Sequence, residues 1–159
     1  MLTKDLLLYE SGSGGQIAIL NNDLVLNEVL YNQFYLALFG GNYEASTTGN
    51  EQNANGRKDY WANSLIFADN PVKQFNSQTE RLLDSVVLNS SGRLEIERAV
   101  NEDLAYLKTL MNFTVNVSFD GSKKVVILVQ FSEKTQQEEK SLQLVFDNAK
   151  KELIIERVI

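Results

Sequence analysis

After the last predicted helix of this chain, the spacing of apolar residues changes from a helical period of about 3.6 residues to the period of about 2 that strands show. The change falls near residue 112. After it, Phe113, Val115, Val117 and Phe119 alternate with polar residues. A chain whose helices precede its main strands does not wind as βαβ units, so we predict a segregated α+β fold.

Three helices are expected in residues 27–111. The first opens near Asn27 and stops at Gly40-Gly41, because glycines commonly end helices. The second follows the capping-box sequence Ser77-Gln78-Thr79-Glu80, and the third begins around Ser91-Gly92. Their apolar stripes are, in order, Leu30, Phe34, Ala37 and Leu38; Leu82, Leu83, Val86 and Val87; and Ile96, Val100, Leu104, Leu107 and Met111. The third helix also has i,i+4 ion pairs at Arg93/Glu97 and Arg98/Glu102.

Strands are expected at both ends of the chain. Within residues 1–22, the segments 5–9 and 16–19 flank a glycine-rich turn and predict a short β-hairpin. Residues 113–159 predict an antiparallel β-meander whose first turn is Asp120-Gly121. Its later strands are Lys124–Ser132, a segment with alternating Leu142, Leu144 and Phe146, and Glu152–Val158.

The composition narrows the possible functions. The 159 residues are typical of one domain, and they include no cysteine and no histidine. Ser-His-Asp catalysis, thiolate chemistry and histidine-based metal sites are therefore excluded. The absence of cysteine favours a reducing compartment. A net charge of −6 with scattered Lys and Arg argues against nucleic acid, and no apolar run reaches membrane-span length.

Other chemical motifs are weak. The segment Ser11–Gly15 lacks the Gly-Lys-Ser/Thr ending of a phosphate loop, and Glu133, Glu138 and Glu139 lack the spacing of a calcium loop. Glu95 and Glu97 point to different faces of a helix, so they make a poor acid pair. We predict no catalytic, cofactor-binding or metal-binding residues and keep a carboxylate-dependent hydrolase as a remote alternative.

The candidate interaction residues follow a polar stretch. Residues 42–58 are rich in Asn, Gly and Thr, which predicts an exposed and mobile loop. Directly at its end come Arg57, Tyr60, Trp61 and Asn63, and aromatic residues beside Arg and Asn are typical of interface anchors. The alternative is that Trp61 packs into the core beneath the loop. Glu97 joins the candidates because its helix face is either solvated or contacts a partner.

Several segments occur in a recognisable order: Asp23-Leu24-Val25-Leu26, a helix ending in Leu38-Phe39, a polar loop, Arg57 with Tyr60-Trp61-Ala62-Asn63, Ser77-Gln78-Thr79-Glu80-Arg81-Leu82-Leu83, and Glu97-Arg98-Ala99-Val100. Over about residues 16 to 110, this order resembles the phage Mu-type baseplate protein family. That family is related to the lysozyme-like wedge proteins of contractile tails, the sheath initiators. One departure is that Leu107-Lys108-Thr109-Leu110 stands where those relatives often have Glu-Pro-Arg.

The resemblance implies a structural protein of a virion, assembled in the bacterial cytoplasm in several copies per ring. Its partners would be baseplate wedge subunits for the helical half and tail sheath subunits for the sheet. The candidate free edges for sheath arms are Lys124–Ser132 and Glu152–Val158, and Ile155 lies in the second. The alternatives are a tail-assembly chaperone and a generic protein-binding module.

Overall fold

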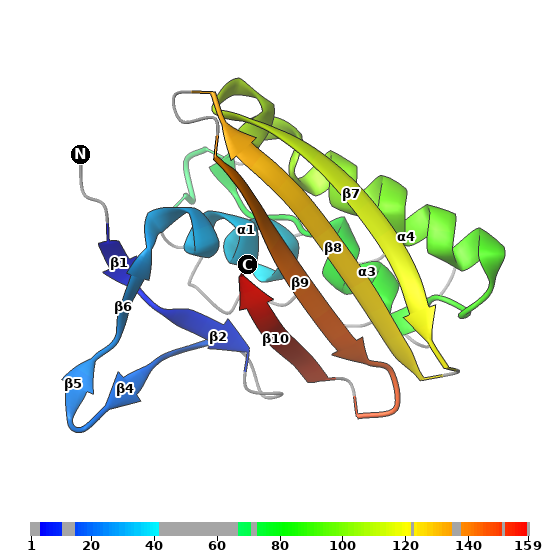
Figure 1. The fold of residues 1–159 in the computed structure, drawn as a ribbon, viewed down its shortest axis with the longest axis horizontal. Helices are drawn as coiled ribbons and strands as arrows, with labels where there is room; N and C mark the ends of the chain where they lie inside the picture. The colour runs from blue at the N-terminus through cyan, green and yellow to red at the C-terminus, as the bar shows by residue number, and fades with distance from the viewer. Residues whose placement is uncertain are drawn as a thin grey trace.

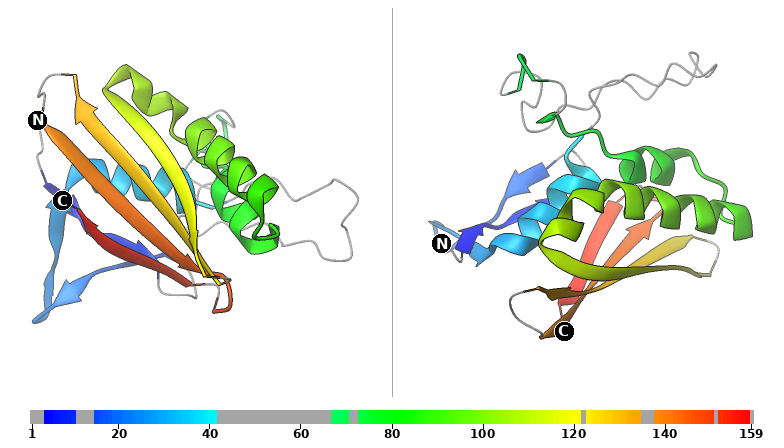
Figure 2. Two further views of the ribbon diagram at one scale, coloured as in Figure 1. Left: turned by 45° about the vertical axis from the view of Figure 1, so that its right-hand side comes forward. Right: turned by 90° about the horizontal axis from the view of Figure 1, so that it is seen from above.

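In the part of the chain that the structure describes, three α-helices lie on one side of a four-stranded antiparallel sheet, and a separate group of short strands precedes them (Figures 1 and 2). The computed structural model describes residues 4–10, 15–41, 67–70, 73–121, 123–134, 138–150 and 152–158. The predicted α+β class is confirmed. The predicted mobile loop 42–58 lies outside the described residues. Within them, no helix is long and apolar enough to cross a membrane.

The sheet is the predicted meander. It consists of β7 (Met111–Asp120), β8 (Lys124–Glu133), β9 (Glu139–Asp147) and β10 (Glu152–Val158), in the spatial order β10-β9-β8-β7. The first hairpin closes at the pair Asp120↔Lys124, and Gly121 in the connecting turn has a φ of 64°. Consecutive strands are therefore neighbours throughout, as a meander requires.

The helices among the described residues are α1 (Val29–Phe39), α3 (Gln78–Ser85) and α4 (Ser90–Asp103), followed by the 3₁₀ helix η3 (Ala105–Thr109). Gly40 and Gly41 follow α1 as predicted, and Gly41 has a φ of 107°. A Cβ on Gly40 would lie 2.3 Å from the Leu36 carbonyl oxygen and 3.0 Å from the Phe75 ring. The chain therefore leaves α1 at a point where only glycine fits between the helix and Phe75.

Two of the apolar stripes predicted for the helices include residues that lie beyond the end of the helix. Leu107 is buried as expected but lies in η3, and Met111 is the first residue of β7, not part of the third helix. Val86 caps the end of α3 in an extended conformation with a ψ of 144°, so Val87 lies beyond the helix and is 70% exposed. Both errors continue a helical pattern past the point where the backbone leaves the helix.

The core lies between the helices and the inner face of the sheet. Register pairs Val117 with Ile127 and Ile127 with Leu144, and all three side chains are buried. The Phe34 ring of α1 packs 4.8 Å from the Phe131 ring of β8. Among the described residues, the largest fully buried side chains are Phe34, Leu38, Leu83, Ile96, Leu104, Leu107, Met111, Ile127, Val100, Val117, Val125 and Val129.

One polar cluster joins the end of α1 to the start of α3. Ser77 is the N-cap of α3, and its Oγ accepts the Glu80 N–H at 3.1 Å, which is the first of the two hydrogen bonds of the predicted capping box. The Ser77 hydroxyl donates to the Leu38 carbonyl at the end of α1, and its N–H donates to the Gly41 carbonyl at 2.9 Å. The end of α1 is therefore fixed directly to the start of α3.

The N-terminal strands form more than the predicted hairpin. The expected pair is present as β2 (Leu8–Glu10) with β3 (Gly15–Ile17). Two further pairs join it, β1 (Lys4–Leu6) with β6 (Leu26–Glu28) and β4 (Ile19–Leu20) with β5 (Asp23–Leu24). The strand region therefore extends to Glu28, beyond the predicted limit at residue 22.

We call these three strand pairs, β1–β6, β2–β3 and β4–β5, arms. They meet at a closed ring of backbone hydrogen bonds. Leu7 N–H donates to Val25 C=O at 2.8 Å, Val25 N–H to Ala18 C=O at 3.0 Å, and Ala18 N–H to Leu7 C=O at 2.9 Å. Each of the three residues thus ends one arm and begins the next. The ring explains how arms of two or three residues per strand stay in register.

Candidate interaction surface

The free edge of β10 is the first part of the candidate surface. β10 pairs regularly with β9 from Glu152↔Asp147 to Ile155↔Leu144, and a bulge then shifts the register before Val158↔Leu142. Within the described residues no strand pairs with its other side, although β2 lies near it. An unpaired edge exposes backbone N–H and C=O groups that can accept a strand from another chain.

The ladder shows which residues of β10 face that edge. The Asn148 N–H donates to Lys123 C=O at 2.7 Å, which extends the β8–β9 ladder by one residue. Because antiparallel ladders alternate, Phe146 and Leu144 also bond β8, whereas Asp147 and Val145 face β10. Their partners Glu152 and Ile154 bond β9. The backbone groups of Leu153 and Ile155 therefore point toward the free edge.

Asp147 fixes the turn that leads into β10. Its Oδ1 accepts the N–H groups of Ala149 at 2.9 Å and Lys150 at 3.1 Å. These backbone hydrogen bonds lower the pKa of the Asp147 carboxyl below its ordinary value. We did not predict this residue from the sequence, although an Asp that bonds the backbone two residues on is a recognised turn signal.

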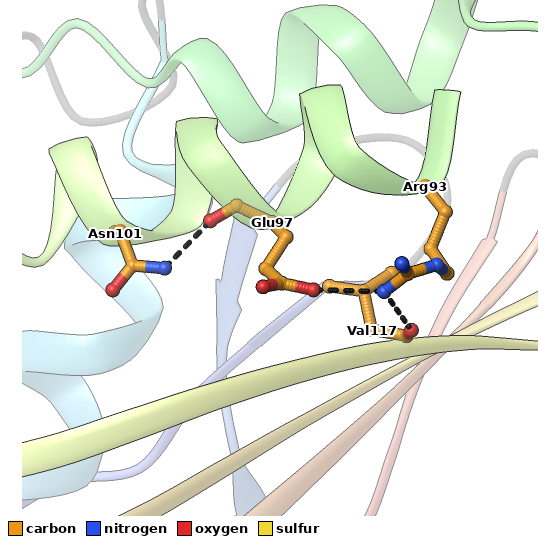
Figure 3. Close-up of polar contacts among 4 residues, drawn as sticks. All are labelled: Arg93, Glu97, Asn101 and Val117. Atoms are coloured by element: carbon orange, nitrogen blue, oxygen red, sulfur yellow. Dashed lines mark hydrogen bonds and ion pairs between the residues drawn. The ribbon is translucent and has the colours of Figure 1, made fainter. Parts of the chain in front are cut away.

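The opposite edge of the sheet is covered by α4 (Figure 3). The Arg93 Nη1 lies 3.5 Å from the carbonyl oxygen of Val117 on β7 and 3.0 Å from Glu97 Oε2. The ladder places the carbonyl of Val117 on the outer side of β7, so Arg93 occupies part of that edge. A charged side chain at an edge strand is a common protection against unwanted pairing.

Glu97 therefore has a structural contact of its own. It pairs with Arg93 as predicted, and its carbonyl accepts the Asn101 Nδ2 at 2.8 Å. The second predicted pair, Arg98–Glu102, is longer at 3.8 Å and more exposed. Both residues belong to α4, and the Glu97 carboxylate holds the Arg93 side chain over β7. Glu97 therefore positions Arg93 at the covered edge of the sheet.

The structure does not bring all the predicted residues together. Arg57, Tyr60, Trp61 and Asn63 lie outside the described residues. Ile155 lies on the free edge, whereas Glu97 lies beside the covered one. The prediction that Lys124–Ser132 could be a free edge was wrong, because this segment belongs to β8, which pairs with β7 and β9 on its two sides.

The remaining surface offers few groups for chemistry in the part of the chain that the structure describes. A shallow open groove at one end of the sheet contains Phe113, Phe131 and Glu139. Among the described residues, no three Asp or Glu side chains gather in a way that could hold a metal ion. No protein family model, no curated protein and no solved structure matches this chain.

Proposed function

We propose that this chain is a structural component of a contractile phage-type tail baseplate. In this proposal the helical half docks on the baseplate wedge, and β10 receives an extended segment of a sheath subunit. The order of segments between residues 23 and 100 supports the family, as described above. The observation that carries the mechanism is that Leu153 and Ile155 direct their backbone groups to an edge that no described strand occupies.

The strength of such a contact is limited by its length. Regular pairing ends at Ile155, where the bulge begins, so Leu153 and Ile155 offer two N–H and two C=O groups. Each hydrogen bond contributes about 0.5 to 1.5 kcal/mol net, so four contribute on the order of 2 to 6 kcal/mol before the incoming segment is ordered. One such contact is weak. Several copies in a ring make the later contacts effectively intramolecular.

The helical half has exposed apolar side chains that suit a second contact. Leu94 on α4 is 56% exposed, and Val87, just before α4, is 70% exposed. In this proposal a wedge subunit covers both of these exposed side chains.

The test is particle assembly with the variant Ile155→Pro. Proline removes the outward N–H of Ile155 but leaves the N–H groups of Glu152 and Ile154, which bond β9, in place. The fold is therefore kept, and baseplates should form while sheath is lost. We expect the yield of sheathed particles in electron micrographs to fall roughly tenfold or more, and Ile155→Val to keep it. Normal sheath yield with Ile155→Pro would contradict the proposal. Absence of the chain from finished particles would instead favour an assembly chaperone.

A further inference from the structure

The β4–β5 arm extends away from the sheet and the helices as a separate two-stranded ribbon (Figures 1 and 2). Asn21 and Asn22 form its two-residue turn with φ values of 52° and 62°, the signature of a type I′ hairpin turn. Its apolar side chains are highly exposed: Ile19 is 68% exposed, Leu20 65% and Leu24 52%. An arm built around a tight turn thus presents its largest apolar side chains to the surroundings.

Each face of the arm has an exposed apolar side chain, and Asp23 shares the face of Leu20. The register pairs Ile19 with Leu24 and Leu20 with Asp23, and successive side chains of a strand point to opposite faces. Ile19 and Leu24 therefore lie on one face, and Leu20 lies on the other. Ile17, 40% exposed, and Leu26, 56% exposed, lie in the neighbouring strands β3 and β6, one residue beyond the base of the arm.

The backbone of the arm argues against a lipid surface as the partner. Each strand of a two-stranded ribbon pairs on one side only, so its outer edge retains polar N–H and C=O groups. Such groups cannot be left unpaired in hydrocarbon. Among the described contacts of β4 and β5, one backbone group has a side-chain partner: the Leu24 N–H donates to Asp23 Oδ1 at 2.8 Å. A protein partner can supply apolar contacts and backbone hydrogen bonds together.

The charge of the arm argues against a second copy of this chain. Between Ser11 and Asn27, Asp23 is the only charged residue, and it is exposed next to the turn. Within the described residues Asp23 has no ion pair. The chain as a whole has a net charge of −6, so two arms brought together repel each other. A partner with positive charge near the arm tip is attracted instead.

We propose that the β4–β5 arm docks on a different protein, at an apolar site with Lys or Arg close to Asp23. This contact is separate from the β10 edge, so it goes beyond the proposed sheath contact and does not depend on it. The partner site must contact both faces of the ribbon, because covering one face alone leaves Leu20 or the Ile19–Leu24 pair exposed.

The test uses two synthetic nine-residue peptides of alternating residues, one of valine and lysine and one of valine and glutamate. Nuclear magnetic resonance of the purified chain follows the methyl groups of Ile19, Leu20 and Leu24 during titration with each peptide. We expect the lysine peptide to shift these methyl signals and the glutamate peptide to bind roughly threefold or more weakly. Asp23→Asn should remove most of that difference between the peptides.

Variants test whether the apolar side chains are responsible. The double variant Ile19→Ser with Leu24→Ser should weaken binding of the lysine peptide about tenfold, whereas Leu110→Ser, which removes a comparably exposed apolar side chain elsewhere, should leave it unchanged. If the double variant unfolds, Leu20→Thr keeps strand propensity and tests the other face.

Three results would overturn the proposal. The first is that neither peptide shifts the three methyl groups. The second is sedimentation of the wild-type chain as a dimer that the double variant abolishes, which would assign the arm to a second copy. The third is flotation with phosphatidylcholine vesicles that depends on Leu20, which would assign it to a membrane.

Discussion

The carboxylate of Asp103, the last residue of α4, accepts the backbone N–H of Thr79 in the first turn of α3 at 2.8 Å. Its other oxygen accepts the Gln78 N–H at 3.0 Å, so one side chain satisfies two of the free N–H groups at the start of α3. Because Ser77 joins the same turn to α1, the three helices share one polar junction at the edge of the core.

This junction predicts a pH dependence of stability. Burial raises the pKa of Asp103 above its ordinary value, although hydrogen bonds from Thr79, Gln78 and Ser77 oppose the effect. The folded chain therefore binds the Asp103 proton more tightly than the unfolded chain does, and this contribution to stability is lost as pH rises through the raised pKa. Urea unfolding should show the stability of the wild type falling relative to Asp103→Asn as pH rises above about 4, the ordinary pKa of an Asp carboxyl. A constant or opposite difference would contradict the assignment.

Ser77→Ala should destabilise the fold by about 1 to 3 kcal/mol. The hydroxyl is buried, accepts the Glu80 N–H and donates to the Leu38 carbonyl, so its loss leaves both groups without this partner. The matched control is Ser85→Ala, which removes only an exposed hydrogen bond to Arg81 C=O and should cost less than about 0.5 kcal/mol. Equal values in urea unfolding would show that the junction does not stabilise α3.

Gly40→Ala should be more costly than Gly121→Ala. The new Cβ at position 40 meets backbone and an aromatic ring, so α1 and Phe75 must separate, and we expect a loss of roughly 2 kcal/mol or more. At position 121 nothing lies within 4 Å, so only the left-handed φ of 64° opposes alanine, at about 1 kcal/mol. Thermal unfolding followed by circular dichroism compares the two. The reverse order would mean that Phe75 does not pack on Gly40.

Proline at two adjacent positions of β10 should give different stabilities. The Ile154 N–H faces β9, so Ile154→Pro removes a ladder hydrogen bond and should cost roughly 1 to 3 kcal/mol more than Ile155→Pro, whose N–H faces outward. Urea unfolding of the isolated chain measures this difference. A larger loss for Ile155→Pro would show that the free edge has been assigned to the wrong residues.

Arg93→Ala should change association more than stability. The Arg93–Glu97 pair is partly exposed and contributes less than about 1 kcal/mol, but its removal uncovers the outer carbonyl of Val117 on β7. We expect Arg93→Ala to self-associate at lower concentration than the wild type in sedimentation experiments. Arg98→Ala removes the more exposed pair with Glu102 and should behave as the wild type does. Identical sedimentation of both variants would contradict a protective role for Arg93.

The elements that were predicted correctly have local signals. The Ser77 cap, the glycines after α1 and the Asp120-Gly121 turn each depend on residues within a few positions, and all three were predicted. The alternation of Phe113 to Phe119 likewise predicted β7. Such features are local because a cap or a turn forms between neighbouring residues, so their chemistry can be read without the rest of the fold.

The missed features depend on long-range pairing. The ring of Leu7, Ala18 and Val25 joins residues up to 18 positions apart through backbone groups, which leave no pattern of side chains. The edge position wrongly given to Lys124–Ser132 depends on strand order. Val125–Val129 is continuously apolar, but burial alternates along it, so this run did not reveal that β8 pairs on both edges. Asp103 as a partner of Thr79, 24 residues away, likewise had no sequence signal.

The order of the elements determines when the core can close during synthesis. The ribosome makes α1, α3 and α4 before the strands that cover them, so the Phe34 ring has no Phe131 to pack against until β8 emerges. Each later strand then adds beside the one before it, across a short connection with a small entropic cost. The nascent helical segment therefore passes through a period of exposed apolar surface, which ends quickly once the sheet begins to form.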